Sequence, residues 1–188
     1  MNGVVLYGPP ASGKSTTTTA LTALDPRFVL LRKFKSGNRR GTEYDFVTPE
    51  HLARLRAAGR LLAETHRYGN IYAIDRHQIE QMTQTGQVPV VHMGNIPDIL
   101  RLAEAGAWLP VLLWVPRDVC ERRSRQRGDG DTARRLSAWD ETLLDLQAHD
   151  AGLFSLRIRT DQTTPGDAAR QIAHAYFRQE APPLDHHA

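Results

Sequence analysis

A glycine-rich segment near the start of the chain constrains the possible folds more than any other feature. Residues 8–15 have the sequence Gly-Pro-Pro-Ala-Ser-Gly-Lys-Ser, which contains every fixed position of a phosphate-binding loop, or P-loop. The apolar run Val4–Tyr7 before it predicts a buried strand, and Thr16–Leu24 after it predicts a helix. Because a P-loop works between a strand and a helix, we expect an α/β fold that holds a nucleotide at this loop.

Two residues of the loop have expected chemical roles of their own. Glycines let backbone N–H groups point at phosphate oxygens, Lys14 can reach the β- and γ-phosphates, and the Ser15 hydroxyl can ligate Mg²⁺. ATP and Mg²⁺ are therefore the expected cofactors, and the alternative is a glycine-rich turn that binds no nucleotide. The expected nucleotide-binding residues here are Gly8, Ala11, Ser12, Gly13, Lys14, Ser15 and Thr16.

Further apolar runs alternate with helical patterns along the chain. This alternation predicts a P-loop NTPase-type parallel sheet flanked by helices, in one domain over residues 1–180 with a disordered tail at 181–188. The run Val111–Val115 is apolar at every position, which is typical of a strand covered on both faces. The other expected strands are Phe28–Leu31, Val88–Val91 and Leu156–Thr160.

Composition limits the compartment and the partners. No apolar run approaches the length of a membrane-spanning helix, and Cys120 is the only cysteine, which favours a reducing cytoplasm. The net charge is only +3, although arginines concentrate between Arg117 and Arg135. We therefore expect an anionic small molecule as partner, with nucleic acid unfavoured, and a protein that is a monomer or homodimer.

Two basic segments interrupt the alternation, and both are expected to close over ligands. The first covers residues 32–75 and is expected to bind a second phosphate-bearing ligand, because it combines cations with tyrosine hydroxyls. Taken singly, each of these tyrosines also suits a half-buried core position. The candidate residues in this segment are Arg39, Arg40, Tyr44, Tyr72 and Asp75.

The second basic segment, residues 122–135, is expected to form a short arginine-rich lid. Arg123 and Arg127 are four residues apart, so one helix face would present both to the same phosphates. Gly128 and Gly130 then break the helix, and Arg134 and Arg135 follow. The alternative is a basic face turned to solvent.

These blocks together resemble guanylate kinase and its relatives. The resemblance runs from the P-loop through Tyr44–Val47, Leu61–Ala63 and Gly69–Tyr72 to the arginines at 123–135. It implies that Arg39 or Arg40, with Tyr44 and Tyr72, hold the acceptor phosphate. It also implies that Arg123 and Arg127 cover ATP, that Arg134 or Arg135 bridges donor and acceptor, and that the loop Thr160–Pro165 packs against adenine.

Two departures from this family concern the acceptor. The family places a guanine-recognising glutamate where this chain has Ala63, and acidic residues where the strand after Val88 leads into His92. An alanine cannot accept hydrogen bonds from guanine, and each donor left unpaired in a buried site costs about 1–3 kcal/mol. His92 is a candidate for recognising a base or a sugar hydroxyl, or simply a satisfied strand-end histidine. Asp75 is a reserve candidate for Mg²⁺ or an acceptor hydroxyl, and a helix N-cap explains it equally well.

The sequence thus predicts an enzyme, an ATP-dependent kinase acting on a phosphate-bearing small molecule. The catalytic candidates are Lys14, Arg123, Arg127 and Arg135, and the preferred acceptor is a nucleoside monophosphate other than GMP. One alternative is a sugar-phosphate kinase, since the resemblance at Leu61–Ala63 extends to ribosyl bisphosphate phosphokinase. Others are a non-catalytic guanylate-kinase-like binding module, and an NTPase or RNA-end kinase.

Overall fold

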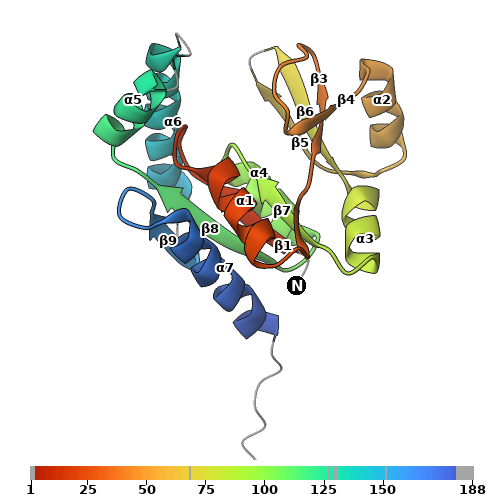
Figure 1. Ribbon diagram of the computed structural model, residues 1–188. Coiled ribbons are helices and arrows are strands. Elements are labelled where there is room, and N and C mark those ends of the chain that lie inside the picture. Colours follow the sequence, from red (N-terminus) through yellow and green to blue (C-terminus); the bar gives the residue numbers. More distant parts are fainter. Residues whose placement is uncertain (1–2, 68, 127, 129–130, 151, 181–188) are drawn as a thin grey trace, which may run out of the picture.

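The computed structural model describes residues 3–67, 69–126, 128, 131–150 and 152–180, and within them the chain forms two sheets (Figure 1). The larger sheet has five parallel strands in the order β2-β7-β1-β8-β9, with helices on both faces. This arrangement confirms the expected α/β fold with a parallel sheet. The strands are β1 (Gly3–Tyr7), β2 (Phe28–Leu30), β7 (Val88–His92), β8 (Trp108–Trp114) and β9 (Leu156–Arg159).

Side chains that alternate along β1 divide the core into two clusters. Val4 and Leu6 belong to a cluster that contains residues of α1 (Lys14–Leu24) and α7 (Pro165–Glu180). Val5 and Tyr7 belong to a second cluster on the opposite face, since successive side chains of a strand point to opposite sides. The helices that contribute to this second cluster are α3 (Arg76–Gln84), α4 (Ile96–Glu104) and α6 (Thr132–His149).

The position of β1 explains where ligands can bind. It lies between β7 and β8, and the strands are connected in opposite directions on its two sides. In open α/β sheets, ligands bind outside the carboxyl ends of the strands at such a reversal point. The P-loop follows β1 directly and therefore occupies this position.

Residues 33–75 form the second sheet, over the stretch where the sequence predicts only an excursion. Its strand order is β4-β3-β6-β5, with β3 and β4 parallel and the other pairs antiparallel. Helix α2 (Pro49–Ala57) is capped by Thr48, whose hydroxyl accepts from the His51 N–H at 3.2 Å. The strands are β3 (Lys33–Ser36), β4 (Tyr44–Phe46), β5 (Leu61–Arg67) and β6 (Asn70–Asp75).

The arginine-rich segment spans the end of one helix and the start of the next. Helix α5 (Arg117–Gln126) carries Arg123, and α6 begins at Thr132. Gly128 lies between them with a φ of +68°, a left-handed conformation that favours glycine. Figure 1 shows α5 and the second sheet on opposite sides of α1. Residues 127 and 129–130 of the expected lid, and the expected tail at 181–188, lie outside the described residues.

Candidate nucleotide and phosphate-acceptor site

The backbone of the P-loop has the shape that phosphate binding requires. A Cβ atom at Gly8 would lie 2.0 Å from the Leu113 carbonyl oxygen, so β8 allows only glycine there. Ala11 and Gly13 both have left-handed φ values, +59° and +87°. A Cβ at Gly13 would meet no other atom closer than 4.0 Å, so open space lies at the N-terminus of α1. Helix N-termini attract anions, and this space suits the phosphates of a nucleotide.

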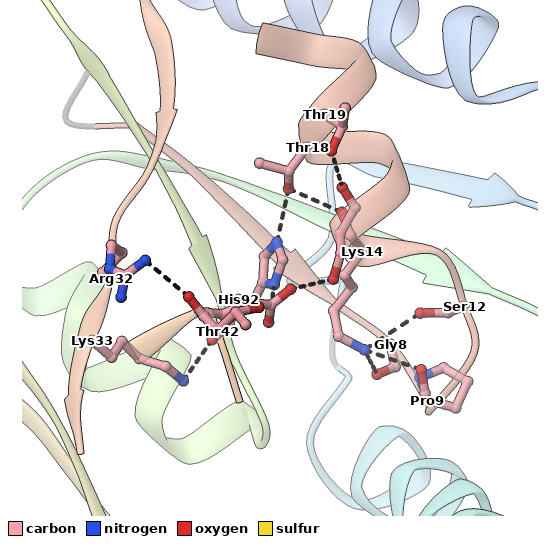
Figure 2. Close-up of polar contacts among 12 residues, drawn as sticks. Gly8, Pro9, Ser12, Lys14, Thr18, Thr19, Arg32, Lys33, Thr42 and His92 are labelled. Carbon is pink, nitrogen blue, oxygen red and sulfur yellow. Dashed lines mark hydrogen bonds and ion pairs between the residues drawn. The ribbon is translucent and has the colours of Figure 1, made fainter. Parts of the chain in front are cut away.

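Lys14 lies back over the loop that precedes it (Figure 2). Its Nζ donates to the carbonyl oxygens of Gly8 at 2.7 Å and Pro9 at 3.0 Å, with a longer contact of 3.4 Å to Ser12 Oγ. The ammonium group is therefore held at the loop, in a position to meet phosphate oxygens there.

Arg123 joins the P-loop to the loop after β9. Its guanidinium donates to the Ala11 carbonyl at 2.9 Å and to the Thr160 carbonyl at 2.7 Å. The Thr160 hydroxyl in turn donates to the Ser12 carbonyl at 2.8 Å. Beside these contacts is a pocket of about 170 Å³, where the sequence places the adenine. Its lining includes Ala11, Gly13, Thr16, Thr17, Arg123, Thr160, Thr163 and Pro165.

On the acceptor side, Tyr44 and Tyr72 come together around a lysine. Their ring centroids are 5.2 Å apart, and Lys35 Nζ lies 5.1 Å from the Tyr44 centroid and 5.6 Å from that of Tyr72. Lys35 is buried and donates to Asn38 Oδ1 at 2.9 Å and to the Arg40 carbonyl at 2.6 Å. The two tyrosines that the sequence groups together thus lie side by side, and the cation between their rings is Lys35.

Arg39 and Arg40, the cations expected at that position, are both exposed. The Arg39 guanidinium lies 5.9 Å from the Phe46 centroid, and Arg40 contacts Lys35 through its carbonyl oxygen. Their role toward an acceptor phosphate stays a prediction. The signal for Lys35 was its spacing: Lys33 and Lys35 alternate along β3 and share one face of the sheet.

Lys33 extends this basic face toward the P-loop. Its Nζ donates to the His92 carbonyl at 2.7 Å, and burial lowers the pKa of Lys33 to about 8, although Asp98 and Glu43 oppose the change. Lys33 is therefore a cation at neutral pH that loses its charge on mild alkalinisation. It lines a pocket of about 220 Å³, which is the candidate acceptor pocket. Lys33, Tyr44, Thr65, Arg67, Tyr72 and Gly94 line this pocket.

His92 lies at the end of β7, between α1 and the second sheet (Figure 2). Its Nε2 is 2.8 Å from Thr18 Oγ1, and its Nδ1 is 3.4 Å from Glu43 Oε2. Glu43 also accepts a short hydrogen bond from the Ser15 hydroxyl. Sequence reasoning missed Glu43, which lies just before the first tyrosine block and gave no separate signal.

The structure also locates Ala63, which the resemblance aligns with a guanine-recognising glutamate, and its neighbour Glu64. Ala63 pairs with Ile74, lies on the same face of β5 as Thr65, and is 5% exposed. Glu64 points to the opposite face, where it accepts from Arg56 at 2.8 Å and contacts His66 at 2.6 Å. The Glu64 carboxylate therefore cannot replace the missing one on the acceptor side.

Asp75 has the capping role that the sequence left as an alternative. Its carboxylate accepts from the His77 N–H at 3.2 Å, and Arg60 donates to both of its oxygens. Asp75 is 2% exposed, so these two partners hold it at the start of α3. Its expected substrate or metal role finds no support in these contacts.

The remaining lid arginines differ in their surroundings. Arg134 is exposed and pairs with Asp131 at 3.3 Å, so it does not reach the P-loop in this conformation. The positive charge of Arg135 acts on the buried Cys120 thiol, which donates to the Pro10 carbonyl at 3.2 Å. Arg135 is half-buried at the start of α6, and Arg127 lies outside the described residues.

The described residues contain neither a metal-binding cluster nor a membrane-spanning helix. No three His, Cys, Asp or Glu side chains gather there as a metal cluster. Within that same part of the chain, no helix has the length and apolar character needed to cross a membrane.

Sequence comparisons relate the chain to guanylate kinases. Residues 1–164 match the family model described as guanylate kinase. Guanylate kinase from Nitratidesulfovibrio vulgaris is 30% identical over 163 residues, which cover 81% of this chain and 78% of that protein. Guanylate kinase from Symbiobacterium thermophilum is 35% identical over 98 residues, or 46% of its length, so the chain spans about half of this relative.

A solved structure extends the likeness to the fold. Guanylate kinase from Anaplasma phagocytophilum superimposes with a TM-score of 0.65 at 16% identity, covering 96% of this chain and 87% of that one. At this identity the structural match supports the fold alone. The family-model match over residues 1–164 and the similarity to the Nitratidesulfovibrio vulgaris protein show that the chain belongs to the guanylate kinase family.

Proposed function

We propose that this protein is a kinase that transfers the γ-phosphoryl group of ATP to a phosphate-bearing small molecule, a nucleoside monophosphate other than GMP. The observation that carries the proposal is the placement of two phosphate-binding surfaces around one point. The P-loop lies on one side, and the pocket lined by Lys33 and the paired tyrosines, with Lys35 buried between their rings, lies on the other. Glu43 and His92 connect the two sides directly.

The donor side fits ATP with Mg²⁺. The open N-terminus of α1 would take the phosphates, Ser15 would ligate the metal, and the pocket beside Thr160 would take the base. Mg²⁺ would neutralise charge on the transferring group. Lys14 and Arg123 add positive charge at the loop. Because an acceptor phosphate is itself a nucleophile, no general base is required.

Ala63 and His92 support an acceptor other than GMP. The resemblance places a guanine-recognising carboxylate at the position of Ala63, and here that position holds a methyl group buried in an apolar cluster, on the same face of β5 as Thr65. Each guanine donor left unpaired costs about 1–3 kcal/mol, so GMP would bind more weakly by about tenfold or more per donor.

A sugar phosphate is the second candidate, and the position of Arg67 favours it. Arg67 contacts the Gly94 carbonyl at 3.4 Å and forms a short ion pair with Glu141. Thr65, Arg67 and Gly94 line both the acceptor pocket and a neighbouring pocket that includes Asn95 and Asp145. Arg67 thus lies at the boundary between the acceptor pocket and the neighbouring pocket. An acceptor without a base would fit the acceptor pocket alone.

Direct measurement of transfer from ATP tests the proposal. The purified protein is incubated with Mg²⁺·ATP and one of AMP, CMP, UMP, dTMP, GMP, ribose 5-phosphate or ribose 1,5-bisphosphate, and the phosphorylated product is quantified. The Lys14→Ala protein, prepared identically, controls for contaminating kinases. We expect one of the non-GMP acceptors to be phosphorylated with the highest kcat/KM.

Each outcome of this panel separates the candidates. Preference for GMP would overturn the acceptor assignment, and preference for a ribose phosphate would select the second candidate. ATP binding without transfer to any acceptor would favour the non-catalytic alternative. With Cys120 as its only cysteine, we expect the protein to work in the cytoplasm, as a monomer or homodimer.

A further inference from the structure

A carboxylate from the second sheet reaches the residue expected to hold Mg²⁺. Glu43 precedes β4, yet its Oε1 accepts a hydrogen bond from the Ser15 hydroxyl at the start of α1. Its other oxygen faces His92 Nδ1 at 3.4 Å. Glu43 thus contacts α1 and the end of β7 at the same time.

The side chains around Glu43 hold it in this place. The His92 ring is fixed on its far side by Thr18 of α1, at 2.8 Å, and its carbonyl accepts from Lys33. One third of the Glu43 side chain remains exposed, so its carboxylate borders the open space at the P-loop. Mg²⁺ in nucleotide sites prefers oxygen ligands and is bound through one or two carboxylates together with phosphates.

At the carboxyl end of β7, this chain offers the imidazole of His92. Imidazole nitrogen is a poor partner for Mg²⁺, whereas carboxylates and hydroxyls suit it. Among the described residues, Glu43 is the carboxylate that the structure joins to the Ser15 hydroxyl.

We propose that Glu43 completes the Mg²⁺ site with Ser15, supplying from the second sheet the carboxylate that the end of β7 lacks. This inference rests on the proposed function. It also links the two halves of the site, because the metal and its nucleotide would hold residue 43, and with it the start of β4, against the P-loop. Glu43 would then order the acceptor pocket as the donor binds.

Metal affinity, measured without turnover, tests this role. Free Mn²⁺ is followed by its electron paramagnetic resonance signal during titration of the protein saturated with the non-hydrolysable analogue AMP-PNP. Calorimetry with AMP-PNP in EDTA gives the affinity for the metal-free nucleotide. The variant is Glu43→Gln, and the matched control is Glu64→Gln, which removes the same charge from the opposite face of the same sheet.

We expect Glu43→Gln to weaken Mn²⁺ binding by about 10- to 100-fold, as for other residues that position a metal or its ligands. Metal-free AMP-PNP should bind as well as before or better, since a negative charge near the phosphates is gone. Unchanged Mn²⁺ affinity would overturn the proposal. So would tighter Mn²⁺ binding, which would show that Glu43 merely occludes Ser15.

A double-mutant cycle with Ser15→Ala distinguishes a shared metal site from a general loss of structure in the variants. If both residues act on one metal ion, the combined loss of Mn²⁺ affinity will be clearly smaller than the product of the single losses. Independent, multiplicative losses would contradict a shared site. If the unmodified protein binds no AMP-PNP at all, it is the proposed function that fails.

Discussion

The donor and acceptor halves of this site are built in different ways. The donor half consists mainly of consecutive residues, 8–15, whose backbone shape binds phosphate and whose conformation depends on local glycines. The acceptor half consists of side chains from β3, β4, β5 and β6, which only the second sheet brings together. A backbone site is specific for phosphate in general, whereas a side-chain site can change its ligand by single substitutions.

This difference explains why the donor half retains the residues expected of its family, whereas the acceptor half departs from them. The P-loop retains all its fixed positions, whereas the acceptor face has Ala63 and the β7 end has His92. Substitutions in the two halves should therefore have different effects on donor and acceptor binding.

Removing Lys14 should have the largest effect. Lys14→Ala takes away the positive charge at the P-loop, and the loss of one preorganised electrostatic donor costs about 100- to 1,000-fold in kcat. We expect a loss at the upper end of this range with an unchanged unfolding midpoint. Steady-state kinetics and thermal unfolding check it, and near-normal turnover would show that this half of the site is not catalytic.

Removing Lys35 should damage only the acceptor half. Lys35→Met keeps the length of the buried chain and removes the charge between the two tyrosines. A hydrogen bond to a charged group contributes about 1.5–3 kcal/mol, so the KM for the acceptor should rise about 10- to 100-fold while that for ATP stays constant. The control is Arg40→Met, at an exposed position. An equal rise in the KM for the acceptor in this variant would favour Arg40 as the phosphate-binding residue.

Introducing the family's carboxylate at position 63 should cost stability. Ala63 is 5% exposed and belongs to an apolar cluster with Ile74 and Val91. Burying a carboxylate there without a partner should lower the free energy of unfolding by about 2 kcal/mol or more. Urea unfolding of Ala63→Glu, with Ala63→Gln beside it, measures this cost. A stable Ala63→Glu protein that phosphorylates GMP would instead show that the position opens to a base.

The smallest expected effect is a pH dependence of acceptor binding. Burial lowers the pKa of Lys33 to about 8, so the side chain is a cation below that pH and becomes neutral above it. The KM for an anionic acceptor should therefore rise, by less than about tenfold, between pH 7 and 9. Kinetics across this range check the rise, and Lys33→Met should abolish it. A slope that persists in Lys33→Met would assign the titration to another group.

Much of the core could be predicted because its signals are local. The apolar runs at β1 and β8 and the P-loop glycines depend on near neighbours in the sequence, and the strands form where they were expected. The second sheet could not be predicted in the same way. Its strands β3 and β4 are short and carry cations, and their pairing with β6 depends on residues far along the chain.

Individual site residues show the same division. The sequence predicts that Tyr44 and Tyr72 act together, and the pairing of β3 with both β4 and β6 brings their ring centroids to 5.2 Å. The sequence allows Asp75 to be either a ligand-binding residue or a helix N-cap. Its contact with Arg60 favours the second interpretation. Glu43 had no signal at all, because its importance comes from a contact with Ser15, 28 residues away.

The parallel α/β core, the P-loop and the lack of a carboxylate at position 63 follow from residue identity and short-range pattern, so they can be read from the amino-acid sequence. The positions of Lys35 between the tyrosines, of Glu64 on the opposite face of β5 and of Glu43 against Ser15 depend on the folded chain. Strand pairing selects which side chains share a face of a sheet, and that pairing is made by contacts distant in the chain.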